Sequence, residues 1–323
     1  MLRSKIVERV FSHKEDCPTV LLANINTSID LHKNLAKIEE IIEIAHEKRV
    51  NIVIFPELAI TGYIWESLED QEIFHHLRAG ESNLVKNCLN NIRNSLVDNG
   101  KGLEYVFINN AREKNGSLYN STYVINSKID HYEESIIYDK IFLTPLEQRY
   151  FKRGSDKRLV IDTKWGRFGF LTCYDLCFMD LAKKYAFIDD VDVIVTIAAW
   201  RAQAIRDYSL MNIRTDNYYG YLWDLMNSSK AAHNQVWSLG VNCVGSHEVT
   251  GSIFWGKSGI WAPSGLPLLQ ASNMREELLI IRNIDIKDPI NQEWVEFNYR
   301  IEFNNIYKPI LETNSHIIDF KNN

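Results

Sequence analysis

Three segments of the chain each place one reactive side chain directly after an apolar run. Glu57 follows IVIFP, Lys140 follows SIIYD, and Cys173 follows GRFGFLT. Catalytic groups are often found at strand ends, because the strand fixes the position and the following loop leaves the side chain accessible. A thiol, a carboxylate and an ammonium group can act as nucleophile, proton acceptor and oxyanion support in an attack on a carbonyl carbon. The three residues therefore predict covalent catalysis through a cysteine.

The residues around Cys173 make this prediction more specific. A helix is expected to begin near Phe178, so the thiolate would lie beside a helix N-terminus and the Lys140 ammonium. Both should lower the pKa of Cys173. The backbone amide of Tyr174 is expected to bind the oxyanion together with Lys140. Asp175 is interpreted as a structural residue that accepts hydrogen bonds within the turn.

The elements that must position these residues follow from the spacing of apolar residues. Apolar runs predict strands at 20–25, 51–55, 105–109, 159–162, 167–172, 192–198, 236–242, 257–261 and 278–284, and a pair of strands within 116–137. Helical spacing is found at 31–48, where Asp30 can cap the first turn, at 82–99 and at 221–232. Helices and short buried strands alternate along the chain. The predicted fold class is therefore α/β, with mixed sheets covered by helices.

Composition and charge limit the class of protein. Of the 323 residues, 46% are hydrophobic and 24% are charged, as in a globular protein. The net charge of −6 argues against sequence-independent nucleic-acid binding, which needs a basic face. We find no apolar run long enough for a membrane span and no apolar centre of a signal peptide. Few, scattered cysteines favour reduced thiols, so we expect a cytoplasmic protein that acts on a small molecule without a cofactor or a metal ion.

The segments around the three residues resemble those of the nitrilase superfamily, the carbon–nitrogen hydrolases with a Glu–Lys–Cys triad. Seven blocks follow the family's order across nearly the whole chain: FPELAITGY, NNAREKNGSLYNSTYVI, YDKIFL, VIDTKWGRFGFLTCYDLCF, DVIVTIAAW, KAAHNQVWSLGVNCVG and GKSGIWAPSG. The resemblance implies a four-layer α–β–β–α sandwich with two mixed sheets, in a hydrolase domain spanning residues 1–285. It also implies that Glu57 is the general base, that Lys140 supports the oxyanion and the substrate, and that Cys173 is the nucleophile.

Further site residues follow from the same resemblance. Some branches use a glutamate in the loop that holds Glu147 to support the substrate, although TPLEQRYF would equally suit a solvated helix start. Many members carry an arginine four residues after the nucleophile, where this chain has Cys177. We therefore expect substrates that are neutral or apolar at the acyl end, unless Arg201 or Arg206 supplies the missing charge. The pocket is expected to include Tyr63, Trp200, Arg201 and Cys177.

The predicted reaction is hydrolysis of a non-peptide C–N bond, of the amide or carbamoyl type, through a thioester acyl-enzyme. An acyltransferase would use the same acyl-enzyme, with an amine in place of water. A nitrilase is less favoured. The nitrilase branch has a sequence similar to Cys-Trp-Glu at the nucleophile, whereas this chain has Cys173, Tyr174 and Asp175. The sequence does not decide between two branches of the family, the Nit or ω-amidase branch and the biotinidase or pantetheinase branch. A non-catalytic interaction protein is the alternative from another class.

Two further segments carry expectations of their own. Residues 286–323 form an aromatic extension that we expect to pack on a partner subunit or a sheet edge, in a homodimer or a larger even homo-oligomer. Residues 205–221 form an aromatic insert after a predicted strand end. We expect the insert to form a wall or a lid of the pocket, and a surface loop is the alternative.

Overall fold

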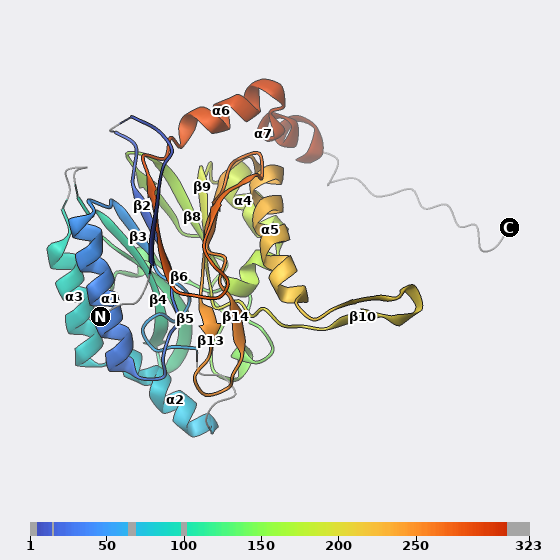
Figure 1. Cartoon of the computed structure of the whole chain (residues 1–323). Coiled ribbons are helices and arrows are strands. Elements are labelled where there is room, and N and C mark those ends of the chain that lie inside the picture. Colours follow the sequence, from blue (N-terminus) through green and yellow to red (C-terminus); the bar gives the residue numbers. More distant parts are fainter. Residues whose placement is uncertain (1–4, 15, 64–68, 98–101, 309–323) are drawn as a thin grey trace.

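Two mixed β-sheets pack face to face, and helices cover their outer faces (Figure 1). The computed structural model describes residues 5–14, 16–63, 69–97 and 102–308. One sheet has seven strands in the order β1 (Lys5–Val10), β17 (Glu277–Arg282), β2 (Val20–Asn24), β3 (Ile52–Ile54), β4 (Tyr105–Lys114), β5 (Ser117–Ile125) and β6 (Ile137–Asp139). The other has six strands in the order β16 (Pro267–Gln270), β15 (Gly259–Trp261), β12 (Trp237–Asn242), β9 (Val193–Ala198), β8 (Gly166–Thr172) and β7 (Val160–Thr163).

The remaining elements are helices and two small hairpins. The helices are α1 (Leu31–Glu47), α2 (Asp70–Arg78), α3 (Asn83–Ser95), α4 (Met179–Phe187), α5 (Tyr218–Asn234), α6 (Lys287–Glu296) and α7 (Tyr299–Glu302). The hairpins pair β10 (Arg206–Tyr208) with β11 (Ile213–Thr215) and β13 (Val244–Ser246) with β14 (Ile253–Trp255). In the first sheet β2, β3 and β4 run parallel, as do β8, β9 and β12 in the second.

Alternation within single strands explains why the sheets are apolar on both faces. In β2, Val20 and Leu22 face the second sheet, whereas Leu21 and Ala23 pack with residues of α1 and α3. Successive side chains of a strand point to opposite faces, so a strand covered on both sides has a continuous apolar sequence. The second sheet is covered in turn by α4 and α5 (Figure 1). The predicted four-layer α–β–β–α sandwich is confirmed.

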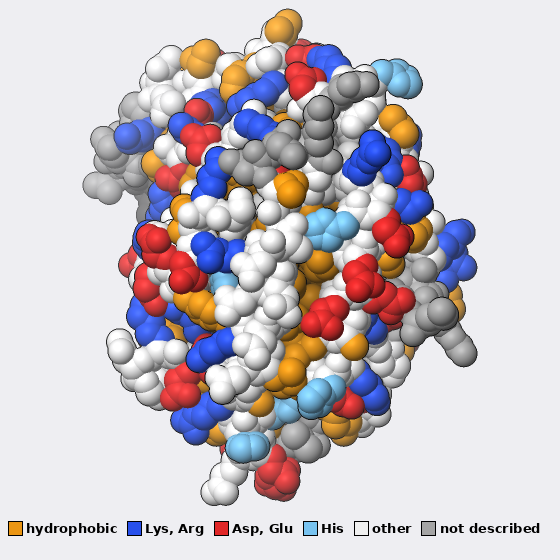
Figure 2. All heavy atoms as spheres, turned by 90° about the vertical axis from the view of Figure 1, so that its left-hand side faces the viewer, with side chains coloured by type: hydrophobic (Ala, Val, Ile, Leu, Met, Phe, Trp, Pro, Cys, Tyr) orange, Lys and Arg blue, Asp and Glu red, His pale blue; other side chains and the backbone are white. Residues whose placement is uncertain are grey.

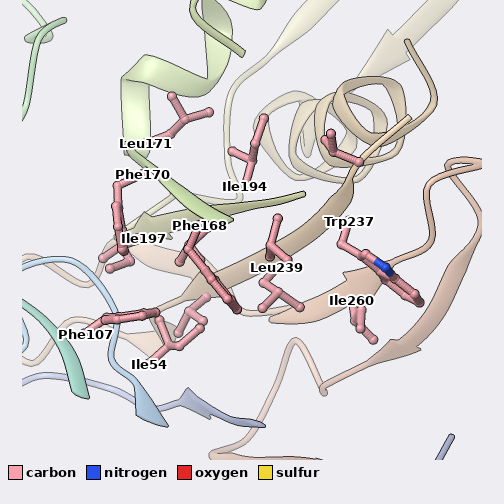
Figure 3. Packing of buried hydrophobic residues seen from close by; sticks show 14 of the residues in the cluster. Ile54, Phe107, Phe168, Phe170, Leu171, Ile194, Ile197, Trp237, Leu239 and Ile260 are labelled. Atoms are coloured by element: carbon pink, nitrogen blue, oxygen red, sulfur yellow. The ribbon is translucent and has the colours of Figure 1, made fainter. Parts of the chain in front are cut away.

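Aromatic and aliphatic side chains fill the space between the two sheets (Figure 3). Phe107 of β4 meets the ring of Phe170 from β8 edge-on, with the ring centres 5.0 Å apart, and lies 6.1 Å from the ring of Phe168. Ile54 of β3 packs in the same cluster. Burial of each such side chain contributes about 1.5–3 kcal/mol to the free energy of unfolding. This packing holds the strand ends of the two sheets in register with each other.

The outer helix α1 begins where the sequence predicts. The Asp30 carboxylate accepts hydrogen bonds from the backbone N–H groups of His32 at 3.0 Å and Lys33 at 3.4 Å. A cap of this kind contributes about 1 kcal/mol. Acidic and basic side chains are interspersed over the face that α1 and α3 present (Figure 2). Within the described ranges, every helix is too short or too polar to cross a membrane.

Some elements differ from the prediction. The segment β1 pairs with β17 at the sheet edge, but its residues are mostly exposed, so it carries no apolar pattern in the sequence. The helix expected near Phe178 is present as α4, which begins at Met179, and the unpredicted element is the 3₁₀ turn at Cys173–Cys177 that precedes it. The turn is short because the chain must leave β8 sharply before α4 can pack on the sheet.

The insert after β9 forms an arm that projects from the body of the molecule (Figure 1). At its tip, Leu210 is 104% exposed and Met211 is 71% exposed. The expectation of a pocket wall or lid is therefore wrong for the tip within a single chain. Only the base of the segment reaches the body, where the carbonyl of Tyr219 accepts a hydrogen bond from Trp200 Nε1 at 2.7 Å.

The described part of the C-terminal extension packs on its own chain. The ring of Phe303 lies 5.0 Å from that of Phe187 in α4. Ile286 and Ile290 are buried in the main core, so the core continues past the predicted boundary at residue 285. Packing of the extension on a partner subunit stays a prediction, and residues 309–323 lie outside the described residues.

A lysine is buried between α5 and the second sheet with uncharged hydrogen-bond partners. The Lys230 ammonium donates to Thr196 Oγ1 at 2.5 Å and to Asn227 Oδ1 at 3.2 Å, and the residue is 0% exposed. Burial lowers the pKa of Lys230 well below its ordinary value.

Stability should therefore depend on pH through Lys230. Between the lowered pKa of the folded state and the ordinary value of 10.5, the unfolded chain binds a proton that the folded chain does not, so the free energy of unfolding rises with pH. Relative to Lys230→Met, the wild type should gain up to about 1.4 kcal/mol per pH unit in this window. Urea denaturation from neutral pH upward measures the difference. Lys184→Met, on the exposed side of α4, is the matched control, and a pH-independent difference for Lys230→Met would contradict the prediction.

Candidate active site

The three predicted triad residues lie at the ends of strands from both sheets. Glu57 follows β3 and Lys140 follows β6 in the seven-stranded sheet, whereas Cys173 follows β8 in the six-stranded sheet. A backbone hydrogen bond of 3.3 Å from Glu57 N to Ala198 O joins the sheets at this point. The structure thus brings together residues separated by more than a hundred positions in the sequence.

A sharp turn after β3 directs Glu57 into the interior. Leu58 has φ of 51°, and its N–H donates to Asn109 Oδ1 at 2.8 Å. Gly62 has φ of 79°, and a Cβ there would lie 2.2 Å from the carbonyl oxygen of Ser28, so the turn requires glycine. The Glu57 side chain is 0% exposed as a result.

A buried ionic cluster surrounds the Lys140 ammonium. Lys140 Nζ donates to Glu57 Oε1 at 2.9 Å and to Glu147 Oε1 at 2.6 Å. Asn120 Nδ2 donates to the same two oxygens at 2.8 Å and 3.2 Å. Burial alone would lower the pKa of Lys140, but the negative charges of Glu147 and Glu57 raise it well above the ordinary value. The ammonium therefore stays charged and is available to bind a developing oxyanion.

The second oxygen of each carboxylate is also fixed. Glu57 Oε2 accepts the backbone N–H of Ala199 at 2.9 Å. Glu147 Oε2 accepts hydrogen bonds from the backbone N–H of Thr144 at 2.9 Å and from its hydroxyl at 3.0 Å. Glu147 is 2% exposed and lies in the buried ionic cluster with Lys140 rather than on a solvated helix start. Both carboxylates are held by donors that do not depend on Lys140.

Cys173 occupies a strained turn between β8 and α4. Its φ of 47° is unfavourable for a residue with a side chain. Asp175 holds the turn by accepting hydrogen bonds from Thr172 N at 2.9 Å, Phe142 N at 2.8 Å and the Tyr138 hydroxyl at 2.8 Å. Burial raises the pKa of Asp175 to about 6. The structural role predicted for Asp175 is confirmed by these contacts.

The predicted direction of the Cys173 pKa is wrong. Burial and the negative charge of Glu57 raise the pKa of Cys173 well above its ordinary value, and Lys140 opposes them only in part. The raised pKa favours the protonated thiol at rest, so a nucleophilic role for Cys173 would need a proton acceptor such as Glu57.

The predicted pocket residues lie at different depths. Tyr63 is half-buried beneath the guanidinium of Arg201, whose carbon is 5.7 Å from the ring centre. Trp200 is buried at 7% exposure and packs on Trp223, with ring centres 6.0 Å apart. Cys177 is half-buried, and burial raises its pKa to about 11.

Tyr174 packs beside the nucleophile. Its ring meets the ring of Phe178 edge-on, with a centre-to-centre distance of 5.3 Å. Phe178 in turn stacks on Phe142 at 3.6 Å. These aromatic contacts fix the backbone that carries the Tyr174 amide. Binding of an oxyanion by that amide stays a prediction.

Comparison with known proteins decides the family. The sequence model described as carbon-nitrogen hydrolase matches residues 19–289, which include every strand of the two sheets except β1 and all three triad positions. The chain belongs to the carbon–nitrogen hydrolase family. It is therefore a hydrolase of this family, and the recognised resemblance is confirmed.

The relatives of this carbon–nitrogen hydrolase include nitrilases and amidases. A probable nitrilase of Schizosaccharomyces pombe is 25% identical, over 87% of this chain and 94% of the relative. The N-carbamoylputrescine amidase of Solanum lycopersicum is 24% identical, over 93% of this chain and 97% of the relative. The solved carbon-nitrogen hydrolase of Helicobacter pylori G27 has a TM-score of 0.73 at 17% identity, covering 93% of this chain and 100% of that chain.

Another solved structure is much longer than this chain. The glutamine-dependent NAD+ synthetase of Acinetobacter baumannii matches with a TM-score of 0.64 at 20% identity, over 81% of this chain. The chain spans less than half of that enzyme, 45% of its length. This likeness therefore concerns the fold of one part of the synthetase.

Asn120 is the site residue of this hydrolase that sequence reasoning missed. It lies in β5, within the block NNAREKNGSLYNSTYVI, and its side chain contacts both Glu57 and Glu147. Thr122, two positions further along, shares its face and lies 3.5 Å from Thr172 Oγ1. Alternation along β5 places Asn120 on the inward face, so a buried asparagine at strand spacing was the available signal.

Glu57→Gln should accelerate alkylation of Cys173 while it suppresses turnover. The charge of Glu57 raises the pKa of Cys173, so its removal should move the pH profile of alkylation to lower pH. In the wild type, the rate should still be rising above pH 9, the ordinary value for a thiol. Iodoacetamide labelling followed by mass spectrometry measures both profiles. Glu147→Gln, whose charge acts more weakly on the thiol, should give a smaller shift in the same direction, and slower labelling of Glu57→Gln would contradict the prediction.

Proposed function

We propose that this hydrolase cleaves the C–N bond of a small amide or carbamoyl compound through a thioester on Cys173. The observation that carries the proposal is the convergence of a thiol, the Glu57 carboxylate and the buried Lys140 ammonium at one point between the sheets. The names of its relatives, nitrilase and N-carbamoylputrescine amidase, support chemistry on carbon–nitrogen bonds. Cys-Tyr-Asp at the nucleophile favours the amidase side.

In the first half of the reaction, Glu57 takes the thiol proton as the sulfur of Cys173 attacks the carbonyl carbon. The carbonyl oxygen becomes an oxyanion, which Lys140 and the amide of Tyr174 would bind. The protonated Glu57 then gives its proton to the departing nitrogen, the C–N bond breaks, and an amine or ammonia leaves. One oxyanion donor is typically worth about 3–4 kcal/mol in the barrier.

In the second half, water attacks the thioester while Glu57 takes one of its protons. The C–S bond breaks, the acid is released, and the sulfur recovers its proton. Glu147 would hold Lys140 and the substrate in place throughout the reaction, because its carboxylate accepts a hydrogen bond from the Lys140 ammonium. An amine that replaced water in this step would make the protein an acyltransferase.

Trapping of the acyl-enzyme tests the proposal. The protein is mixed with a panel of amides, carbamoyl compounds and nitriles, quenched in acid and examined by peptide mass spectrometry. We expect the acyl mass on the peptide that contains Cys173, and none in Cys173→Ala. Release of the acid in water, compared with transfer to added hydroxylamine, separates hydrolysis from acyl transfer. Absence of acylated Cys173 with every member of the panel would refute the proposed function.

We also propose a homodimer or larger even homo-oligomer. Large apolar side chains are exposed along the arm and the exposed side of α5, including Ile205, Tyr208, Leu210, Met211 and Leu225. Exposed apolar area of this extent favours association with another subunit. Sedimentation at micromolar concentration tests the assembly, and a stable monomer would refute it.

A further inference from the structure

One buried carboxylate joins the segment of Cys173 to the segment of Lys140. Asp175 is 0% exposed and follows Cys173 by two residues, in the turn after β8. Its Oδ2 atom accepts a hydrogen bond from the backbone N–H of Thr172 at 2.9 Å. This contact spans Cys173, because Thr172 is the residue before it. The carboxylate therefore closes the turn in which Cys173 lies.

The same carboxylate holds the segment of Lys140 from both sides. The Tyr138 hydroxyl, two residues before Lys140, donates to Asp175 Oδ2 at 2.8 Å. The backbone N–H of Phe142, two residues after Lys140, donates to Asp175 Oδ1 at 2.8 Å. Tyr138 belongs to β6 in the seven-stranded sheet, whereas Asp175 follows β8 in the six-stranded sheet. Two of the three hydrogen bonds therefore connect the two halves of the sandwich.

The backbone of Lys140 is otherwise bound to its own part of the fold. Lys140 N donates to Asn120 O at 2.8 Å, and Gly154 N donates to Lys140 O at 2.7 Å. These bonds attach Lys140 to β5 and to the loop before β7. Neither bond reaches the turn of Cys173, so neither fixes the lysine relative to the sulfur.

The hydrogen bonds of Asp175 are more directional than the apolar contact beside them. Phe142 stacks on Phe178 with ring centres 3.6 Å apart, which also joins the two segments. Hydrophobic contacts have no preferred direction, whereas hydrogen bonds to an ionised group are short and directional. The backbone of Cys173 is strained, with φ of 47°, and such a conformation persists only where the surroundings determine it. The three hydrogen bonds of Asp175 supply that constraint.

Lys140 and Cys173 lie within electrostatic reach of each other. The charge of Lys140 lowers the pKa of Cys173, although burial and the charge of Glu57 together raise it by more. Conversely, negative charge at Cys173 raises the pKa of Lys140. The relative position of the two groups therefore affects both of them.

We infer that Asp175 is a positioning residue, which fixes the Lys140 ammonium relative to the Cys173 sulfur across the two sheets. The inference rests on the proposed function, in which Lys140 binds the oxyanion that forms when Cys173 attacks. The role goes beyond closure of the turn, which would need only the contact with Thr172. A displacement of about 1 Å in such an arrangement can lower the rate by about 10²-fold.

Two variants and a matched control follow from these contacts. Asp175→Asn keeps the shape of the side chain but replaces one oxygen by an NH₂ group, so at least one donor loses its acceptor. Tyr138→Phe removes one donor and leaves the charge of Asp175 in place. Tyr185→Phe is the control, because Tyr185 is also 0% exposed and its hydroxyl accepts a hydrogen bond from Leu159 N at 3.3 Å. It removes a buried hydroxyl that belongs to neither catalytic segment.

Steady-state kinetics on an amide that the wild type hydrolyses test the positioning role. Asp175→Asn should lower kcat by about 10²-fold and leave KM nearly unchanged, because the oxyanion forms only after attack. Tyr138→Phe should show a smaller loss of the same kind, and Tyr185→Phe should keep the kcat of the wild type. A rise in KM with kcat retained in Asp175→Asn, or an equal loss of kcat in Tyr138→Phe and Tyr185→Phe, would overturn the inference.

Alkylation of Cys173 tests the same role without turnover. If Asp175 holds Lys140 near the sulfur, Asp175→Asn and Tyr138→Phe should both move the pH profile of iodoacetamide labelling to higher pH, because less positive charge acts on the thiol. Loss of the Asp175 charge by itself would move the profile to lower pH. A shift to lower pH in Asp175→Asn, or no shift in Tyr138→Phe, would therefore contradict the positioning role.

Failure of hydrolysis and failure of the positioning role can be told apart. If the wild type hydrolyses no amide of the panel, the proposed function is refuted, and the alkylation profiles still decide the role of Asp175. If the wild type hydrolyses an amide and Asp175→Asn does so equally well, the positioning role is refuted and hydrolysis stands. Mass spectrometry of the labelled samples also checks the fold, because Cys88 and Cys243 are buried and become labelled only on unfolding. If Asp175→Asn does not fold, Tyr138→Phe decides.

Discussion

Cys173→Ala should abolish turnover, and Glu57→Gln should lower kcat by about 10³-fold or more, with the fold retained in both variants. Proton transfer by a positioned carboxylate contributes about 10²–10⁴-fold, and here it also has to create the nucleophile, because the resting thiol has a raised pKa. The two residues act as one unit, so the double variant should be no slower than Cys173→Ala. Steady-state kinetics on the best amide of the panel measure these effects.

A second thiol provides the control for this prediction. Cys17 is half-buried and lies outside the catalytic cluster, so Cys17→Ala should keep the activity of the wild type. Retention of near-normal turnover by Glu57→Gln would rule out Glu57 as the base and would leave the thiol without an identified proton acceptor.

Lys140→Met should lower the free energy of unfolding by about 3–5 kcal/mol, because removal of one partner leaves buried charges uncompensated. Glu57, Lys140 and Glu147 are at most 2% exposed, and the ammonium is shared by both carboxylates. From sequence alone we would expect a Lys140 variant to lose activity without unfolding, and the buried carboxylates change that expectation. Urea denaturation measures the loss.

Two comparisons make the Lys140 prediction specific. The ion pair of Arg149 with Asp70 is 56% and 55% exposed, so Arg149→Met should cost less than about 1 kcal/mol. Lys140→Met with Glu147→Gln should recover part of the loss, because one unpaired charge is removed with the cation. An equal loss in Lys140→Met and Arg149→Met would show that the cluster contributes no special stability.

The three candidate catalytic residues could be singled out because each follows an apolar run in the sequence. Strands such as β2 and β9 are covered on both faces, so their sequences are apolar throughout and easily recognised. Edge strands and arms lack this signal. β1 is exposed except at Val7, and its place beside β17 depends on a pairing between segments about 270 residues apart in the sequence.

The sequence predicts which residues form the site better than it predicts their pKa values. The sequence shows a cysteine followed by a helix and a lysine elsewhere in the chain, which suggests a lowered thiol pKa. It does not show that burial and the charge of Glu57 together act on the pKa of the Cys173 thiol more strongly than the charge of Lys140 does. Asn120 was not predicted as a site residue for a related reason. Its contacts with Glu57 and Glu147 form only when β5 pairs with β6 and the two sheets pack together.

The division of the three candidate groups between two sheets also has a consequence for the order of folding during synthesis. Glu57 and Lys140 belong to the sheet whose strand β17, Glu277–Arg282, lies between β1 and β2, and Cys173 belongs to the other sheet. The first sheet is complete only after nearly the whole chain has left the ribosome. A nascent chain that ends before Glu277 already contains Glu57, Lys140 and Cys173 but lacks the strand that completes the first sheet, so we expect the two sheets to pack and bring the three groups together only late in folding.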